Sequence, residues 1–177
     1  AIIFLVNDLY ETSVTSSINS LRNIRASFTE FANSFAIAAL KNDGSVITWG
    51  DSDYGGDSTS AASELNQDVN QIFSSGGAFA ALKSDGSVVT WGHSSYGGDS
   101  SVVSDLLNNV TEIYSTKPAF AALKSDGSVV TWGDSNYGGD SSSVASQLLN
   151  NVKSITSNGE AFAALKSDGS VITWGKS

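Results

Sequence analysis

Residues 78–92, AFAALKSDGSVVTWG, decide the fold, because the same fifteen letters return at 119–133. Copies at 161–175 and 36–50 differ from this stretch at one and three positions. An active site needs groups that differ from one another, so four near-identical segments indicate structural modules. The tryptophans that close the segments are spaced by 42, 41 and 42 residues: Trp49, Trp91, Trp132 and Trp174. Periods of this length are typical of propellers, solenoids and arrays.

Each copy predicts two strands on either side of an Asp-Gly pair, the signal for a two-residue type I′ hairpin turn. That turn pairs Lys83 with Val88, Leu82 with Val89, and Ala80 with Trp91. It therefore places Phe79 and Trp91 on opposite faces. Both faces are apolar or small, so each needs a cover, as in a blade between blades. A further short strand is expected to begin at Val69, Val110, Val152 and, in a more divergent form, Phe28.

A segment rich in Ser and Asp joins each unit to the next. Tyr137, Gly138 and Gly139 predict a tight turn within it. Asp140 or a following serine is expected to cap a short helix, with Val144, Leu148 and Leu149 on one helical face. We expect one domain with units 28–68, 69–109 and 110–151 and partial units 1–27 and 152–177.

The fold class predicted from these units is all-β, with about four blade-like repeats of 41–42 residues and short connecting helices. A closed β-propeller is the first expectation. An open superhelical array is the alternative.

Composition excludes several classes of function. The formal net charge is -9 and the basic residues are scattered, which argues against nucleic-acid binding. Cysteine is absent, so thiol catalysis and thiolate metal sites are excluded. His93 is the only imidazole that could act as a base for a nucleophile, and equivalent positions hold Asp51 and Asp134. We expect no enzyme and no cofactor. The apolar stretch at 1–6 is too short to span a bilayer.

Structural calcium is the one metal that the sequence raises. The loop at 51–57 contains Asp51, Asp53 and Asp57. Their spacing resembles part of a calcium loop, in which oxygen ligands stand at alternate positions. The sister loops lose candidate ligands, and a helix cap explains the recurring Asp57, Asp99 and Asp140 without a metal. Both interpretations stay open, with the cap favoured.

Two sets of aromatic residues are candidates for recognition. The four tryptophans could line a stacking surface, but their place on a sheet face favours packing anchors between blades. Tyr54, Tyr96 and Tyr137 recur in turns and are expected on one rim of the assembly, where they could bind a partner. The competing interpretation is that each tyrosine covers its own turn.

The repeat resembles the regulator-of-chromosome-condensation-like family. The resemblance rests on Ile72-x-Ser74, Ala80-x-Leu82, Asp85-Gly86, Val88, Trp91-Gly92 and Gly97-Gly98. It covers nearly the whole chain from residue 28 onward. It implies β-propeller blades, usually seven in this family, that serve mostly as protein-interaction platforms. The family's nucleotide-exchange and chromatin contacts have no counterparts that can be placed on this sequence.

The predicted function is a non-enzymatic structural or protein-interaction module within a larger protein or assembly, with a protein partner or self-association. The alternative is a lectin-like or calcium-assisted ligand-binding propeller at the cell surface. An acidic chain without cysteine fits an extracellular or surface protein. A subunit of a large organelle complex would have the same composition.

Overall fold

The structure is a computed structural model that describes residues 32–176. Its strands are β1 (Ala36–Leu40), β2 (Val46–Gly50), β3 (Val69–Ser74), β4 (Ala78–Lys83), β5 (Val88–Gly92), β6 (Val110–Ser115), β7 (Ala119–Lys124), β8 (Val129–Gly133), β9 (Val152–Ser157), β10 (Ala161–Lys166) and β11 (Val171–Gly175). Its 3₁₀ helices are η2 (Ser52–Tyr54), η3 (Thr59–Ala61), η4 (Ser94–Tyr96), η5 (Ser101–Leu106), η6 (Ser135–Tyr137) and η7 (Ser142–Gln147). The partial unit expected at 1–27 and the strand expected from Phe28 lie outside the described residues.

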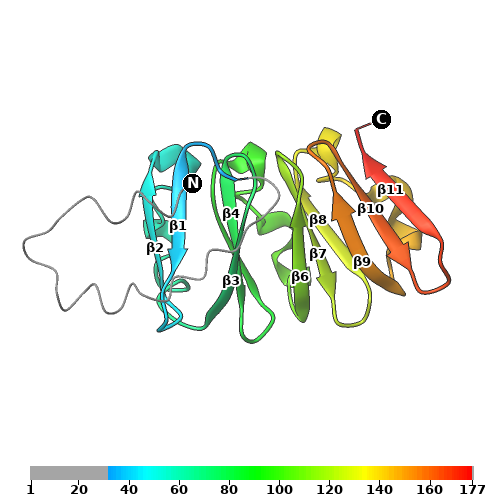
Figure 1. Cartoon of the computed structure of the whole chain (residues 1–177), viewed down its shortest axis with the longest axis horizontal. Helices are drawn as coiled ribbons and strands as arrows, with labels where there is room; N and C mark the ends of the chain where they lie inside the picture. Colours follow the sequence, from blue (N-terminus) through cyan, green and yellow to red (C-terminus); the bar gives the residue numbers. More distant parts are fainter. Residues whose placement is uncertain (1–31, 177) are drawn as a thin grey trace, which may run out of the picture.

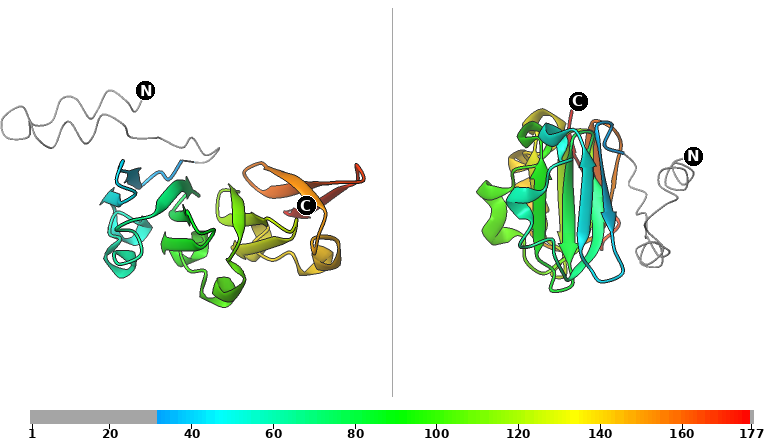
Figure 2. Two further views of the ribbon diagram at one scale, coloured as in Figure 1. Left: turned by 90° about the horizontal axis from the view of Figure 1, so that it is seen from below. Right: turned by 90° about the vertical axis from the view of Figure 1, so that its left-hand side faces the viewer.

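The strands form one two-stranded sheet, β1-β2, and three three-stranded antiparallel sheets, β3-β4-β5, β6-β7-β8 and β9-β10-β11. Figure 1 shows the sheets side by side along the long axis, and Figure 2 shows the connecting helices along one side of the row. The all-β, blade-like fold class is therefore confirmed. Within residues 32–176 the row is open, with β1-β2 at one end and β9-β10-β11 at the other.

The register within each hairpin differs from the prediction by one residue. Phe79 pairs with Trp91, Ala81 with Val89 and Leu82 with Val88, and the other hairpins repeat this register. Phe79 and Trp91 therefore share a face, contrary to the prediction, and their rings stack at 5.2 Å.

The turn explains the shift in register. The Gly86 N–H donates to the Lys83 carbonyl at 3.0 Å, and the Lys83 N–H donates to the Ser87 carbonyl at 2.9 Å. The loop thus has three residues and ends on Gly86 at φ 82°, a left-handed conformation that suits glycine. The Asp85 carboxylate stabilises this form by accepting from the Ser87 N–H at 2.9 Å and hydroxyl at 2.6 Å.

The connecting helices are 3₁₀ and short, and none of those described is long and apolar enough to cross a membrane. The Asp140 carboxylate accepts from the Ser142 N–H, the first of η7, at 2.8 Å. The N-cap position itself is the next residue, Ser141, whose side chain makes no capping bond. The expected apolar face is wrong in part. Leu148 is buried, but Leu149 is 65 % exposed because the helix has already ended at Gln147.

The core lies between successive sheets rather than within one of them. Trp91, Trp132 and Trp174 are 2 %, 1 % and 6 % exposed, which confirms their role as packing anchors. Each indole N–H donates to a glycine carbonyl in the preceding unit's turn: Trp91 to Gly55, Trp132 to Gly97 and Trp174 to Gly138. Trp49, at the end of the row, is 42 % exposed.

Candidate interaction surfaces

A continuous row of aromatic rings crosses the first units at one end of the strands. We call Phe35, Tyr54, His93 and Tyr96 the aromatic row. Tyr54 stacks on Phe35 at 4.2 Å and on His93 at 5.2 Å, measured between ring centroids. Tyr96 meets the edges of Tyr54 at 6.2 Å and His93 at 5.5 Å. Tyr54, His93 and Tyr96 are half-buried and Phe35 is exposed, so the rings offer surface to a partner.

Backbone geometry places the tyrosines. Tyr54 and Tyr96 are the last residues of η2 and η4, and each is followed by a glycine in the left-handed conformation, Gly55 or Gly97. That glycine turns the chain back and leaves the ring against the next unit. A Cβ built on Gly77, in the next unit, would lie 2.8 Å from Cδ1 of Tyr54.

Tyr54 and Tyr96 therefore contribute to the contact between successive units. Their predicted role in recognition stays a prediction, and the structure adds His93 and Phe35 to the same surface. The sequence analysis missed these two residues because their contacts with the tyrosines depend on the distance between neighbouring sheets.

Tyr137 has a different neighbour. The Lys176 Nζ lies 5.0 Å from the centroid of its ring, and Lys176 also pairs with Glu160 at 2.9 Å. The bond to Glu160 and then the contact with Tyr137 raise the pKa of Lys176. Lys176 follows Trp-Gly, as His93 does, so this position stands over the tyrosine of the preceding unit in both places. The position accepts a cation on a tyrosine face.

His93, the only imidazole that the sequence offers as a base for a nucleophile, packs among aromatic rings. It lies between two tyrosine rings, and its buried Nδ1 has no hydrogen-bond partner in the described residues. A catalytic imidazole is normally oriented by a partner at one ring nitrogen.

Two of the three candidate calcium ligands, Asp51 and Asp57, have carboxylates that accept local hydrogen bonds. Asp51 accepts from the Asp53 N–H at 3.0 Å, and Asp57 accepts from the Thr59 N–H at 2.8 Å. Between residues 32 and 176, no group of three or more His, Cys, Asp or Glu side chains could hold a metal ion. The bonds to Thr59 also lower the pKa of Asp57, through the hydroxyl first and the N–H second.

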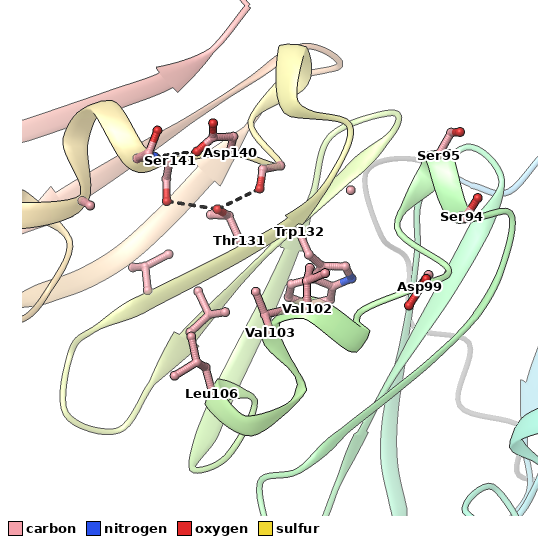
Figure 3. A pocket seen from close by; sticks show the side chains of 16 residues that line it. Ser94, Ser95, Asp99, Val102, Val103, Leu106, Thr131, Trp132, Asp140 and Ser141 are labelled. Carbon is pink, nitrogen blue, oxygen red and sulfur yellow. Dashed lines mark hydrogen bonds between the residues drawn. The ribbon is translucent and has the colours of Figure 1, made fainter.

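A second surface is a groove between two connecting segments (Figure 3). Its volume is about 620 Å³. Val102, Val103 and Leu106 of η5 form an apolar wall, and Asp140 and Ser141 form a polar one. Val102 is 89 % exposed and Leu106 is 53 % exposed. No residue pattern predicted this groove, because its walls come from the connecting segments of two successive units.

Neither the family models nor the curated protein sequences gave a match. Solved structures do resemble the fold. Human WBSCR16 matches with a TM-score of 0.54 at 20 % identity over 81 % of this chain and 46 % of its own.

Yeast RCC1 gives a similar result in two structures. Prp20p from Saccharomyces cerevisiae matches with a TM-score of 0.55 at 20 % identity, over 82 % of this chain and 43 % of its own. Its structure was described together with its binding to Gsp1p and histones. Yeast RCC1 (Prp20) in complex with Kap60 matches with a TM-score of 0.56 at 20 % identity, over 82 % of this chain and 42 % of its own. This chain thus spans less than half of these structures. The likeness supports the resemblance noted in the repeat motif and shows the fold of RCC1-like propeller blades.

Proposed function

We propose that the chain is a non-enzymatic protein-interaction module that binds a basic segment of a partner protein on its aromatic row. The observation that carries the proposal is the contact of Tyr54, His93 and Tyr96 across successive units at one end of the strands. A row of rings held by the backbone loses little entropy on binding.

The charge of the chain favours a basic partner. There are 18 Asp and Glu residues against 9 Lys and Arg. Long-range attraction then steers basic segments to the surface, and ring faces hold individual cations at short range. Lys176 over Tyr137 is an intramolecular instance of that contact.

The test uses a fluorescein-labelled Arg-Gly repeat peptide as the probe. Fluorescence anisotropy at physiological salt compares the full chain with the double variant Tyr54→Leu/Tyr96→Leu. The substitutions leave the net charge unchanged, so a loss of affinity reports on the rings. We expect about tenfold weaker binding, because each exposed cation–π contact contributes about 0.5–1 kcal/mol.

Two further variants separate the possible causes. Tyr96→Phe keeps the ring and should bind like the wild type. Tyr114→Phe changes a tyrosine outside the row and should also leave affinity unchanged. Equal affinity of the wild type and the double variant, with both chains folded, would contradict the proposal.

The groove supports a second candidate, a lectin-like ligand site. A volume of about 620 Å³ lies within the range of small-molecule pockets, and its lining mixes apolar and polar groups. Mono- and disaccharides, with and without Ca²⁺, would be titrated while the methyl NMR signals of Val102, Val103 and Leu106 are followed. Saturable shifts of these signals support the ligand site. Their absence with every sugar removes it.

A further inference from the structure

The two ends of the row expose the faces that every internal sheet buries. At the C-terminal end, Leu165 is 42 % and Val171 is 58 % exposed. At the other end, Ile37, Ile47 and Trp49 are 43 %, 40 % and 42 % exposed. Leu165 and Val171, with Ala161 and Ala163 on the same side of the sheet, form what we call the C-face. Ile37, Ile47 and Trp49 form the N-face.

The internal junctions show what each face normally contacts. Leu123, the equivalent of Leu165, is 6 % exposed and belongs to one cluster with Phe162 and Trp174 of the next sheet. Leu82 occupies the same place one unit earlier, in a cluster with Phe120 and Trp132. The partners in these clusters stand at the positions of Ile37 and Trp49. The C-face therefore has the shape that receives an N-face.

The backbone at the two ends is complementary as well. In the row, the Ser34 N–H donates to Gly76, the Gly76 N–H donates to Lys117 at 2.6 Å, and the Lys117 N–H donates to Gly159 at 3.1 Å. Each unit thus donates to the next one. The series ends with the amide of Gly159 on the C-terminal side and the carbonyl of Ser34 on the other, a donor and an acceptor.

The glycines of the hairpin turns show the same difference between the internal junctions and the C-terminal end. A Cβ on Gly86 would meet Asn109 of the next unit at 3.1 Å, and one on Gly127 would meet Asn151 at 2.9 Å. A Cβ on Gly169 would meet nothing within 4 Å.

From these matches we infer that the C-face of one chain binds the N-face of a second copy, so that the chains associate head to tail. The contact uses two different faces, so it closes into a ring if the curvature of the row permits and otherwise extends. The faces share no residue with the aromatic row, and the inference does not depend on the proposed function.

The experiment follows the mass of the full chain by sedimentation velocity across the micromolar range. The wild type is expected to give dimers or longer species. A C-face variant, Leu165→Glu/Val171→Glu, and an N-face variant, Ile37→Glu/Ile47→Glu, should each weaken association at least about tenfold. These side chains are partly exposed in the single chain, so the variants should fold. Circular dichroism checks that they do.

An equimolar mixture of the two variants decides the geometry. Each variant keeps the face that the other has lost, so the mixture should form heterodimers that grow no further. Leu149→Glu, on a connector residue that is 65 % exposed, is the control and should associate like the wild type. A monomeric wild type would overturn the inference and indicate that the faces are covered by residues 1–31 or used by another protein. A mixture that stays monomeric, or an N-face variant that associates as strongly as the wild type, would overturn it equally.

Discussion

Truncation of one tryptophan at two places in the repeat measures how much the contact between sheets stabilises the row. Trp132 is 1 % exposed and Trp49 is 42 % exposed, although both hold the same position in their units. Trp132→Ala leaves a closed cavity and removes the indole donor to the Gly97 carbonyl at 3.0 Å. We expect a loss of about 3–5 kcal/mol in the free energy of unfolding.

The matched variant Trp49→Ala should cost much less. Its side chain is open to solvent on one face, so no closed cavity forms and only the transfer of its buried part is lost, about 1–2 kcal/mol. For a chain of this size, 1 kcal/mol corresponds to about 2–4 °C in Tm, so the two variants should be separated clearly.

Urea unfolding, followed by circular dichroism at low micromolar concentration, supplies both values. The urea m-value must be unchanged, because a repeat protein can lose one unit before the others. Equal losses for the two variants would refute the assignment of the core to the contacts between sheets. A loss below about 1 kcal/mol at Trp132 would refute it more directly.

Two further predictions concern positions that recur in the units. Gly97→Ala should lower the free energy of unfolding by about 2–4 kcal/mol, because φ is +90° and the new Cβ would lie 2.6 Å from a phenylalanine of the next unit. Gly169→Ala has a similar φ of +87° but an open neighbourhood, so it should cost only about 1 kcal/mol. Thermal unfolding of the two variants compares these losses. The Ser87 hydroxyl and then its N–H lower the pKa of Asp85, so Ser87→Ala should raise that pKa in an NMR titration and leave Asp126 unchanged. The lowered pKa stabilises the fold above about pH 4, the ordinary range of Asp, and this contribution is lost as pH falls through the lowered value. The wild type should therefore be more stable than Ser87→Ala near neutral pH, with the difference disappearing in acid.

The repeat period predicts most of the fold, because equivalent positions in stacked units meet equivalent neighbours. The burial of Trp91, Trp132 and Trp174 was predicted from their place on a sheet face, and it holds although the register behind that prediction was wrong by one residue. The hairpin register did not follow, because Asp-Gly serves both two-residue and three-residue loops. The deciding signal is the serine after the glycine, whose N–H and hydroxyl bind the aspartate, as Ser87 binds Asp85.

The candidate surfaces were less accessible to sequence reasoning. The tyrosine positions were predicted, but the contacts with His93 and Phe35 depend on the distance between neighbouring sheets, which no residue pattern encodes. The exposure of Trp49 is an effect of its place at the end of the row, since its sequence environment matches that of the buried copies.

In each unit, one position combines a fixed backbone hydrogen bond with a side chain that varies. The residue after Trp-Gly makes the same backbone bond in all four copies, donating its N–H at 3.0 Å to the residue before the central strand or hairpin: Asp51 to Phe35, His93 to Gly77, Asp134 to Pro118 and Lys176 to Glu160. Its side chain is not needed for that bond, so it is free to be a carboxylate, an imidazole or an ammonium. Where it is His93 or Lys176, it stands over the tyrosine of the preceding unit. Units with nearly identical cores therefore present different chemistry along one edge. Under the proposed function, this difference would set the register in which the partner binds.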